Sequence, residues 1–179
     1  MSYRIGLDLG GTKVLGIAVD SGHKVVQRKK HRLSNRTDTS AVMDQISNVY
    51  FELAGKLGDE KIASVGIALP SPVDNKLGQA KYLTAFQEKE LPVRDMLKER
   101  TGVDMKLGND VNMATLAEYK FGAGKGVSSL FTFYPGTGLG GGYIYEGKLV
   151  TGFNSTAAEV GHVVIDIDGP LCKCGRHGC

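Results

Sequence analysis

Apolar and polar positions alternate along the first 33 residues and then change to helical spacing. The alternation predicts strands at residues 3–9, 13–19 and 25–33, which would form an antiparallel meander through a tight turn at 10–12. Apolar residues then recur every three to four positions up to residue 57, where Gly58 follows as a stop signal. This spacing predicts a helix over 39–57. The chain therefore opens with strands that are followed by a helix.

The remaining sequence predicts shorter elements in alternating order. We expect strands at 63–69 and 104–107, helices at 92–100 and 111–121, a turn at 74–78, and strands at 129–134, 142–145 and 148–150. This order is typical of a mixed α/β sheet. The glycine-rich segment 122–126 predicts a division into two lobes, residues 1–121 and 122–179. The second lobe restarts the pattern of strand, glycine turn and strand, but has too few elements to bury both faces of a sheet. We therefore expect a fragment, or a subunit that another chain completes.

Composition and charge narrow the class of protein. Hydrophobic residues make up 41% and charged residues 23%, which is typical of a soluble globular protein. The net charge of +3 is too small to predict nucleic-acid binding, and the basic run at 28–32 is interpreted as a solvent-exposed edge, with a binding patch as the alternative. No stretch reaches the apolar length of a membrane span, and the patterned N-terminus leaves no room for a signal peptide. Three cysteines within the last eight residues favour a reduced, cytoplasmic setting.

The first candidate motif is the run Asp-Leu-Gly-Gly-Thr-Lys from Asp8 to Lys13. A turn at Gly10 and Gly11 after a buried strand presents backbone N–H groups to an anion such as phosphate. Thr12 adds a hydroxyl and Lys13 a cation, while Asp8 would hold Mg²⁺ through water. The alternative is a simple hairpin turn.

A second glycine run, Gly-Thr-Gly-Leu-Gly-Gly-Gly, occupies residues 136–142 between two expected strands. Six of its seven residues are glycine or threonine, a composition that is costly to order unless something approaches closely. It is neither a Walker A loop nor a dinucleotide fingerprint. Together with the first motif it predicts two loops that hold one polyphosphate from opposite lobes.

A third motif, Gly-Asn-Asp-Val-Asn, covers residues 108–112 where a strand gives way to a helix. Asp110 would accept the proton of a substrate hydroxyl as that hydroxyl attacks a γ-phosphoryl group. Asn109 can donate and accept hydrogen bonds, which suits a sugar hydroxyl. The alternative is that Asp110 serves only as a helix N-cap.

The tail of the chain gathers three thiols and one imidazole within eighteen residues: His162, Cys172, Cys174 and Cys179. A Cys₃His set of soft ligands indicates a tetrahedral zinc site, and a closed shell of four ligands indicates a structural role. Gly175 and Gly178 would let the loop fold back around the ion. His177, inside the turn, is the second choice as a ligand. Three unrelated buried cysteines would not explain their confinement to the tail.

Together these motifs resemble the repressor, open reading frame and kinase family (ROK), and within it the bacterial glucokinase-like members. The resemblance runs from Ile5 to Cys179, with the four motifs in the family's order. Its signature is Glu-Val-Gly-His at 159–162 followed by Cys-x-Cys-Gly-x-x-Gly-Cys at 172–179. The resemblance implies an α/β fold of actin-like ATPase lobes, hexokinase-type and ribonuclease H-like, with a cleft between two lobes and the second lobe truncated here.

The resemblance also implies roles for individual residues. The first phosphate loop would comprise Asp8, Gly10, Gly11, Thr12 and Lys13. The second would comprise Gly136, Thr137, Gly138, Gly140 and Gly141. Asp110 would be the catalytic base, and the sugar hydroxyls would be held by Asn109, Asp110, Glu159 and His162. His162 would also ligate the zinc, so that the metal fixes a substrate contact.

The sequence departs from the family pattern in three places. Family members carry Pro-Asn-Leu and a tryptophan before the second helix, whereas residues 82–87 here read Tyr-Leu-Thr-Ala-Phe-Gln. Thr84 then takes the asparagine position as a candidate sugar contact. Ala158 stands where glycine is usual. The chain also stops at Cys179, before a family glutamate and the adenosine pocket, so we expect it to be inactive alone.

The expected function is transfer of the γ-phosphoryl group of ATP to a hexose, with glucose as the first candidate. ATP, Mg²⁺ and structural Zn²⁺ are the implied cofactors, and the full-length protein would be a homodimer or homotetramer. Alternatives are a kinase for N-acetylmannosamine, fructose, allose or a β-glucoside, a non-catalytic sugar-binding or zinc-binding lobe, and a sugar-responsive repressor. Family repressors place a helix-turn-helix before the phosphate loop, whereas Asp8 here lies close to Met1. We therefore do not expect DNA binding, nor membrane binding.

Overall fold

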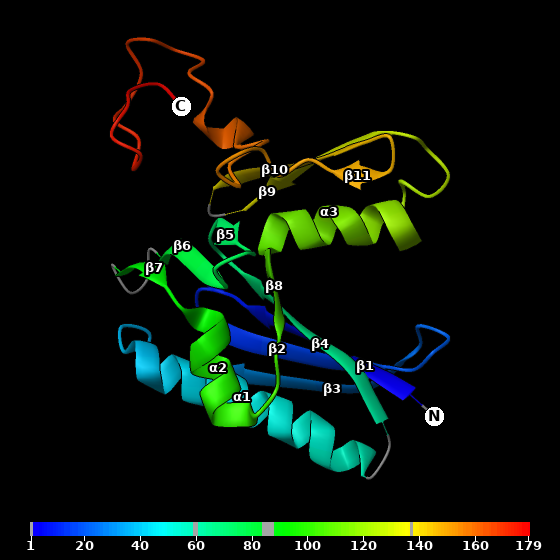
Figure 1. The fold of residues 1–179 in the computed structure, drawn as a ribbon. Coiled ribbons are helices and arrows are strands. Elements are labelled where there is room, and N and C mark those ends of the chain that lie inside the picture. Colours follow the sequence, from blue (N-terminus) through cyan, green and yellow to red (C-terminus); the bar gives the residue numbers. More distant parts are fainter. Residues whose placement is uncertain (1, 59–60, 84–87, 137) are drawn as a thin grey trace. The chain divides into compact units, whose positions relative to one another are not determined.

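A computed structural model describes residues 2–58, 61–83, 88–136 and 138–179. Its main sheet contains five strands in the order β3-β2-β1-β4-β8 (Figure 1). These are β1 (Ser2–Leu9), β2 (Lys13–Val19), β3 (Val25–Arg32), β4 (Lys61–Leu69) and β8 (Lys106–Asn109). The first three strands pair antiparallel, and β1, β4 and β8 pair parallel. The predicted meander and the predicted mixed α/β sheet are both confirmed.

Two helices, α1 (Thr39–Leu57) and α2 (Val93–Thr101), pack on one face of this sheet (Figure 1). The alternation in β1 turns Ile5, Leu7 and Leu9 toward that face, where all three are buried. In β2, a Cβ at Gly16 would lie 2.6 Å from Val49 of α1, so glycine allows the helix to approach this closely. No helix in the described part of the chain is long and apolar enough to span a membrane.

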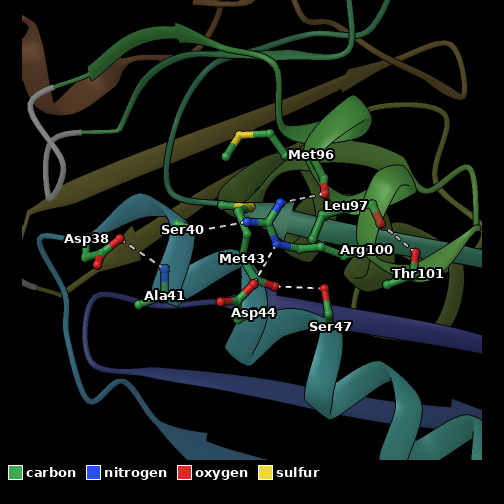
Figure 2. Close-up of polar contacts among 10 residues, drawn as sticks. All are labelled: Asp38, Ser40, Ala41, Met43, Asp44, Ser47, Met96, Leu97, Arg100 and Thr101. Atoms are coloured by element: carbon green, nitrogen blue, oxygen red, sulfur yellow. Dashed lines mark hydrogen bonds and ion pairs between the residues drawn. The ribbon is translucent and has the colours of Figure 1, made fainter.

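Arg100 of α2 makes polar contacts with α1, as Figure 2 shows. Its Nε donates to Asp44 Oδ1 at 2.7 Å, and its guanidinium also donates to Ser40 Oγ at 2.9 Å. The helix α1 begins after Asp38, whose carboxylate accepts a hydrogen bond from the backbone N–H of Ala41. These contacts help to hold the two helices against each other above the shared core.

The strand β3 lies at an edge of the main sheet. Its exposed positions carry positive charges at Arg28, Lys30 and Arg32. The intervening side chains of Lys29 and His31 lie 2.7 and 2.9 Å from the two carboxylate oxygens of Glu52 in α1. The hydrogen bond from Lys29 is the largest of the effects that lower the pKa of Glu52. The basic run therefore lies on an exposed edge.

A small second sheet contains β5 (Val73–Asp74), β6 (Gln79–Leu83) and β7 (Glu88–Leu91), in that order. The predicted turn at 74–78 connects the first two strands, and Asp74 Oδ1 accepts hydrogen bonds from two backbone N–H groups in it. The sequence did not predict these strands, because they are too short to show an alternating pattern. Thr84 lies outside the described residues.

The chain forms two compact units, Met1–Asp110 and Val111–Cys179, and each is described by itself. The second unit contains most of α3 (Asp110–Phe121) and a sheet in the order β11-β10-β9. The strands are β9 (Leu130–Pro135), β10 (Leu139–Tyr145) and β11 (Lys148–Leu149), and a 3₁₀ helix, η1, covers Val160–His162. The lobe boundary predicted after residue 121 differs from this division by α3 alone.

The glycine run at 136–142 is not a loop throughout, which corrects the prediction. The strand β10 begins at Leu139, so residues 139–142 of the run belong to a strand, and the predicted strand at 142–145 begins three residues too late. At Gly141, a Cβ would lie 2.6 Å from the carbonyl oxygen of Ala158. This strand position is glycine because another backbone segment lies against it.

The neighbouring glycines of β10 are approached by α3 instead. A Cβ on Gly140 would lie 2.6 Å from Cγ2 of Val111, and one on Gly142 would collide with Oγ1 of Thr115. Thr115 is fully buried, so it has little room to move aside. Three consecutive glycines thus make a strand thin enough to be packed closely on both faces.

Candidate functional site

The first site lies where parallel strands of the main sheet end. Since β1, β4 and β8 run parallel, their carboxyl ends lie at one edge of the sheet. The register pairs Asp8 of β1 with Ala68 of β4, and Ala68 with Gly108 of β8. Asn109 is the last residue of β8, and Asp110 is the first residue of α3. Two predicted site segments therefore reach the same edge, where ligands bind in open α/β sheets.

The carboxylates at this edge interact electrostatically. Burial raises the pKa of Asp8, the negative charge of Asp110 raises it further, and Lys13 lowers it. The structure thus brings together three predicted site residues, Asp8, Lys13 and Asp110. Carboxylate oxygens are ligands that Mg²⁺ prefers, so this donor set fits the predicted metal chemistry.

The amide group of Asn109 donates hydrogen bonds to two neighbouring residues. Its Nδ2 donates to Asp110 Oδ1 at 3.0 Å and to the carbonyl oxygen of Ser71 at 3.3 Å. Ser71 is buried, its hydroxyl donates to the carbonyl of Pro72, and it accepts a hydrogen bond from the backbone N–H of Tyr82. The sequence pattern did not predict a role for Ser71. The only signal was the two prolines that flank it after a buried strand.

The glycine turn at 10–12 joins β1 to β2 as a hairpin. The N–H of Gly10 donates to the carbonyl of Lys13 at 2.9 Å, and the N–H of Leu33 donates to the carbonyl of Thr12 at 3.0 Å. Gly11, Thr12 and Lys13 are exposed. The hairpin and phosphate interpretations are therefore compatible, because the turn presents a hydroxyl and an ammonium group next to the Asp8 end of β1.

The second glycine turn lies between β9 and β10. The N–H of Gly136 donates to the carbonyl of Gly138 at 2.8 Å, which closes the turn. Gly138 is exposed, and a Cβ there would have open space around it. Thr137 lies outside the described residues.

The tail brings the four predicted metal ligands together, with their ligand atoms all within 4.8 Å of one another. Nδ1 of His162 lies 3.7 Å from Cys172 Sγ and 3.9 Å from Cys179 Sγ, and Cys174 Sγ lies 3.5 Å from Cys179 Sγ. Metal–ligand bonds of about 2.0–2.3 Å in a tetrahedron place ligand atoms roughly 3.5–3.8 Å apart. The four side chains therefore fit a zinc ion.

The backbone of this loop explains why the ligands converge. Gly175 and Gly178 adopt φ values of 87° and 78°, which side-chain-bearing residues rarely adopt. The N–H of Cys172 donates to the carbonyl of Arg176 at 2.8 Å, which closes the loop. His177 lies outside the cluster, with its Nδ1 3.0 Å from the carbonyl oxygen of Gly169. The order of preference among the two histidines agrees with this geometry.

The thiols of Cys174 and Cys179 differ in pKa. A backbone hydrogen bond from Arg176, followed by a side-chain hydrogen bond from Cys179, lowers the pKa of Cys174 to about 6. Hydrogen bonding to Cys172 is the first cause that raises the pKa of Cys179 to about 12. Cys174 therefore loses its proton more readily than Cys179, and the thiolate is the form that binds zinc.

Two further predicted residues lie next to the cluster. Glu159 precedes η1, and its carbonyl accepts a hydrogen bond from the N–H of His162 at 3.0 Å. Ala158, which takes the place of the usual glycine, adopts φ 63°. This backbone conformation explains why glycine suits the position and shows that alanine is strained there.

Known proteins resemble this chain over its whole length. The glucokinase of Streptomyces coelicolor is 34% identical over 179 residues, which is 100% of this chain and 55% of that protein. The N-acetylmannosamine kinase of Pasteurella multocida is 33% identical over 98% of this chain and 57% of its own length. The chain thus spans little more than half the length of these relatives.

A solved structure also matches this chain over nearly its whole length. The ROK family glucokinase of Streptomyces griseus, in complex with glucose and AMPPNP, matches with a TM-score of 0.85 and 33% identity. The match covers 99% of this chain and 55% of that protein. The predicted actin-like fold is therefore confirmed. The sequence model of the ROK family matches residues 4–179, and the chain belongs to the ROK family.

Proposed function

We propose that this chain is part of a kinase that transfers the γ-phosphoryl group of ATP to a hexose, with glucose as the first candidate. The observation that carries the proposal is the electrostatic interaction of Asp110 with Asp8 at the carboxyl edge of the parallel strands. The glucokinases at 34% and 33% identity support this activity, although the chain spans about 55% of their length.

Asp110 is the proposed catalytic base. A carboxylate can accept the proton of the sugar hydroxyl that attacks the γ-phosphoryl group. The hydrogen bond from Asn109 Nδ2 to Asp110 Oδ1 orients the carboxylate, and the contact with the carbonyl of Ser71 fixes the amide in turn. A base held in this way retains its position relative to the substrate, which is a large part of the catalytic effect.

Asp8, Thr12 and Lys13 are the proposed contacts to Mg²⁺ and phosphate. When bound, Mg²⁺ neutralises the charge of the phosphates during transfer. The partly buried carboxylate of Asp8 would hold the ion through water, while Lys13 and the N–H groups of Gly11 and Thr12 would face phosphate oxygens. The second glycine turn, residues 136–138, is proposed as a further phosphate contact. Gly140 and Gly141 support this turn through their packing in β10.

The proposed sugar contacts are Asn109, Asp110, Glu159 and His162, and Thr84 is a further candidate. The geometry of His162 supports its double role. Because its Nδ1 faces the thiols, Nε2 would carry the ring proton in the metal-bound state and could donate it to a sugar hydroxyl. Zinc on the Cys₃His cluster would thus have a structural role and fix the orientation of this ring.

Turnover by Asp110→Asn in the full-length protein that contains this sequence tests the proposal. We expect a loss of about a thousandfold or more in glucose phosphorylation, because the amide cannot accept the proton, while glucose affinity changes little. Asp104→Asn is the matched control, since Asp104 is exposed and forms a long ion pair with Arg94 at 3.7 Å. Unchanged turnover in Asp110→Asn would rule out the proposed base.

N-acetylmannosamine is the second candidate substrate, since a kinase for it is 33% identical to this chain. The threonine at position 84 replaces an amide with a shorter hydroxyl, which changes the hydrogen bonds offered to a sugar. A panel of hexoses assayed at equal concentration would separate the two candidates. Thr84→Asn is expected to shift preference toward glucose if the position contacts the sugar.

A further inference from the structure

We infer that the Cys₃His cluster is a site of oxidative modification, in which peroxide joins Cys174 to Cys179 as a disulfide and thereby releases the metal. This inference rests on the zinc proposal for its second half, the release. The first half concerns the thiols alone. It depends on the different exposure of the three cysteines and on the close approach of one pair.

The cysteines differ in their access to solvent. Cys174 is exposed, whereas Cys172 and Cys179 are partly buried. Oxidants reach exposed thiols first, so Cys174 is the thiol that reacts with peroxide. Cys174 lies in an irregular loop that is closed by the bridge between Leu171 and His177.

Distance and chain geometry indicate which thiol forms the disulfide with Cys174. Sγ of Cys179 lies 3.5 Å from Sγ of Cys174, a separation that small backbone shifts can close to the about 2 Å of a disulfide. Between them lies Gly175, which is exposed, has positive φ and would have open space around a Cβ, so the segment has room to move there. A bridge from Cys174 to Cys172 would instead span a single residue, which strains disulfide geometry.

The reaction balances with hydrogen peroxide as the oxidant. The thiolate of Cys174 attacks one peroxide oxygen, the O–O bond breaks, and a sulfenic acid forms with release of hydroxide. The thiolate of Cys179 then attacks the sulfenic sulfur, the S–S bond forms, and a second hydroxide leaves. Two protons convert both hydroxides to water. The two sulfurs lose two electrons in total, and the peroxide gains them.

Loss of the metal follows from the ligand count. A disulfide sulfur is a poor zinc ligand compared with a thiolate, so oxidation leaves only His162 and Cys172. Two ligands do not hold the ion against solvent. The orientation of His162 would then no longer be fixed by the metal. Oxidation therefore acts on the same imidazole that the proposed function assigns to the sugar.

Two ligand-swap variants provide a matched test in the full-length protein loaded with zinc. Cys172→His and Cys174→His both leave two thiolates and two imidazoles, which is a normal zinc donor set. Only Cys172→His retains the reactive pair. We expect peroxide to release zinc from the wild type and from Cys172→His at similar rates, and roughly tenfold more slowly from Cys174→His. Released zinc is measured with a chromogenic chelator.

Peptide mapping by mass spectrometry without reduction supplies a readout that needs no variant. We expect a disulfide between Cys174 and Cys179 in the peroxide-treated wild type. A disulfide that contains Cys172, or equal release rates in the two variants, would overturn the inference. A wild-type protein that binds no zinc would instead overturn the metal proposal, while the disulfide map still decides which thiols react.

Discussion

Asp110 lies close enough to Asp8 to oppose its ionisation, although the two residues belong to different strand ends of the main sheet. Burial raises the pKa of Asp8 most, the Asp110 carboxylate adds to this, and Lys13 acts in the opposite direction. Two partly buried carboxylates beside one another form an arrangement that a divalent cation would stabilise.

Asp110→Asn should lower the pKa of Asp8. The substitution keeps the shape of the side chain and removes the negative charge, so only the contribution of burial remains to raise the pKa. The measurement is a titration of the Asp8 carboxyl carbon by NMR. Asp104→Asn, which changes an exposed carboxylate, should leave this titration unchanged. An unaltered Asp8 pKa in Asp110→Asn would show that the two carboxylates do not interact.

Asp8→Asn should stabilise the fold at neutral pH while it impairs the proposed Mg²⁺ site. The folded-state pKa of Asp8 lies above its ordinary value of 3.8, so the folded protein binds the proton more tightly than the unfolded chain. The wild type therefore loses stability as the pH rises from 3.8 through the higher folded-state pKa of Asp8, and Asp8→Asn avoids that loss. The gain over the wild type should disappear at pH values below 3.8.

Asp74→Asn is the control, because the contribution of Asp74 to stability should change with pH in the opposite direction to that of Asp8. The backbone hydrogen bond from Leu77 is the first cause that lowers the pKa of Asp74. Its contribution to stability is present above the unfolded value of 3.8 and is lost as the pH falls through the lower folded value. Urea unfolding across this pH range should show a penalty for Asp74→Asn at neutral pH only. Parallel curves for both variants would contradict the assignment.

Gly142→Ala should destabilise the second unit by about 1–3 kcal/mol, because the added methyl group collides with the buried Thr115. Gly138→Ala is the matched control, since a Cβ there meets nothing within 4 Å. The free energy of unfolding, measured in denaturant, separates the two variants. Equal stability of Gly142→Ala and Gly138→Ala would mean that α3 does not pack as closely on β10 as described.

Ala158→Gly should stabilise the chain by about 0.5–1 kcal/mol, because it removes the strain of a side chain at φ 63°. The neighbouring Ala157→Gly should have the opposite effect, since Ala157 has no positive φ and glycine only adds freedom to the unfolded chain. Thermal unfolding of the two variants side by side gives the comparison. A loss of stability in both would place residue 158 in an ordinary conformation.

Removal of zinc by a chelator should loosen the tail and leave the main sheet intact. The tail from residue 163 to 179 is held chiefly by loop hydrogen bonds and the proposed metal, so hydrogen exchange should increase there and not in β1 or β4. His177→Ala should keep its zinc, because the ring lies outside the cluster, whereas Cys172→Ala should lose it. Equal zinc content in these two variants would contradict the ligand assignment.

The sequence predicted the elements with strong periodicity closely. The strand β2 and the helix α1 have the predicted bounds, since alternation and helical spacing are sustained over their whole length. The strands β5 to β7 were not predicted, because each is short and depends on pairing with its neighbours. The glycines of β10 were assigned to a loop because glycine normally weakens a strand. Only the packing of α3 and of Ala158 on that strand shows why they are needed.

The parts of the candidate site whose residues lie close together in the sequence were predictable. The metal cluster follows from residue type and spacing alone, and the structure brings all four side chains together. The hydrogen bond between Asn109 and Ser71 was not predictable, because the two residues are separated by 38 positions and meet only through the pairing of β4 with β8. The interaction of Asp8 with Asp110 depends on the same strand order.

The basic residues of β3 have a consequence for the behaviour of the molecule in solution. An edge strand offers unpaired backbone groups to which a strand of a second molecule could add. In β3 the exposed side chains of Arg28, Lys30 and Arg32 line this edge with like charges. A second copy aligned along it would bring two positive rows together, so the charges protect the sheet against growth into aggregates.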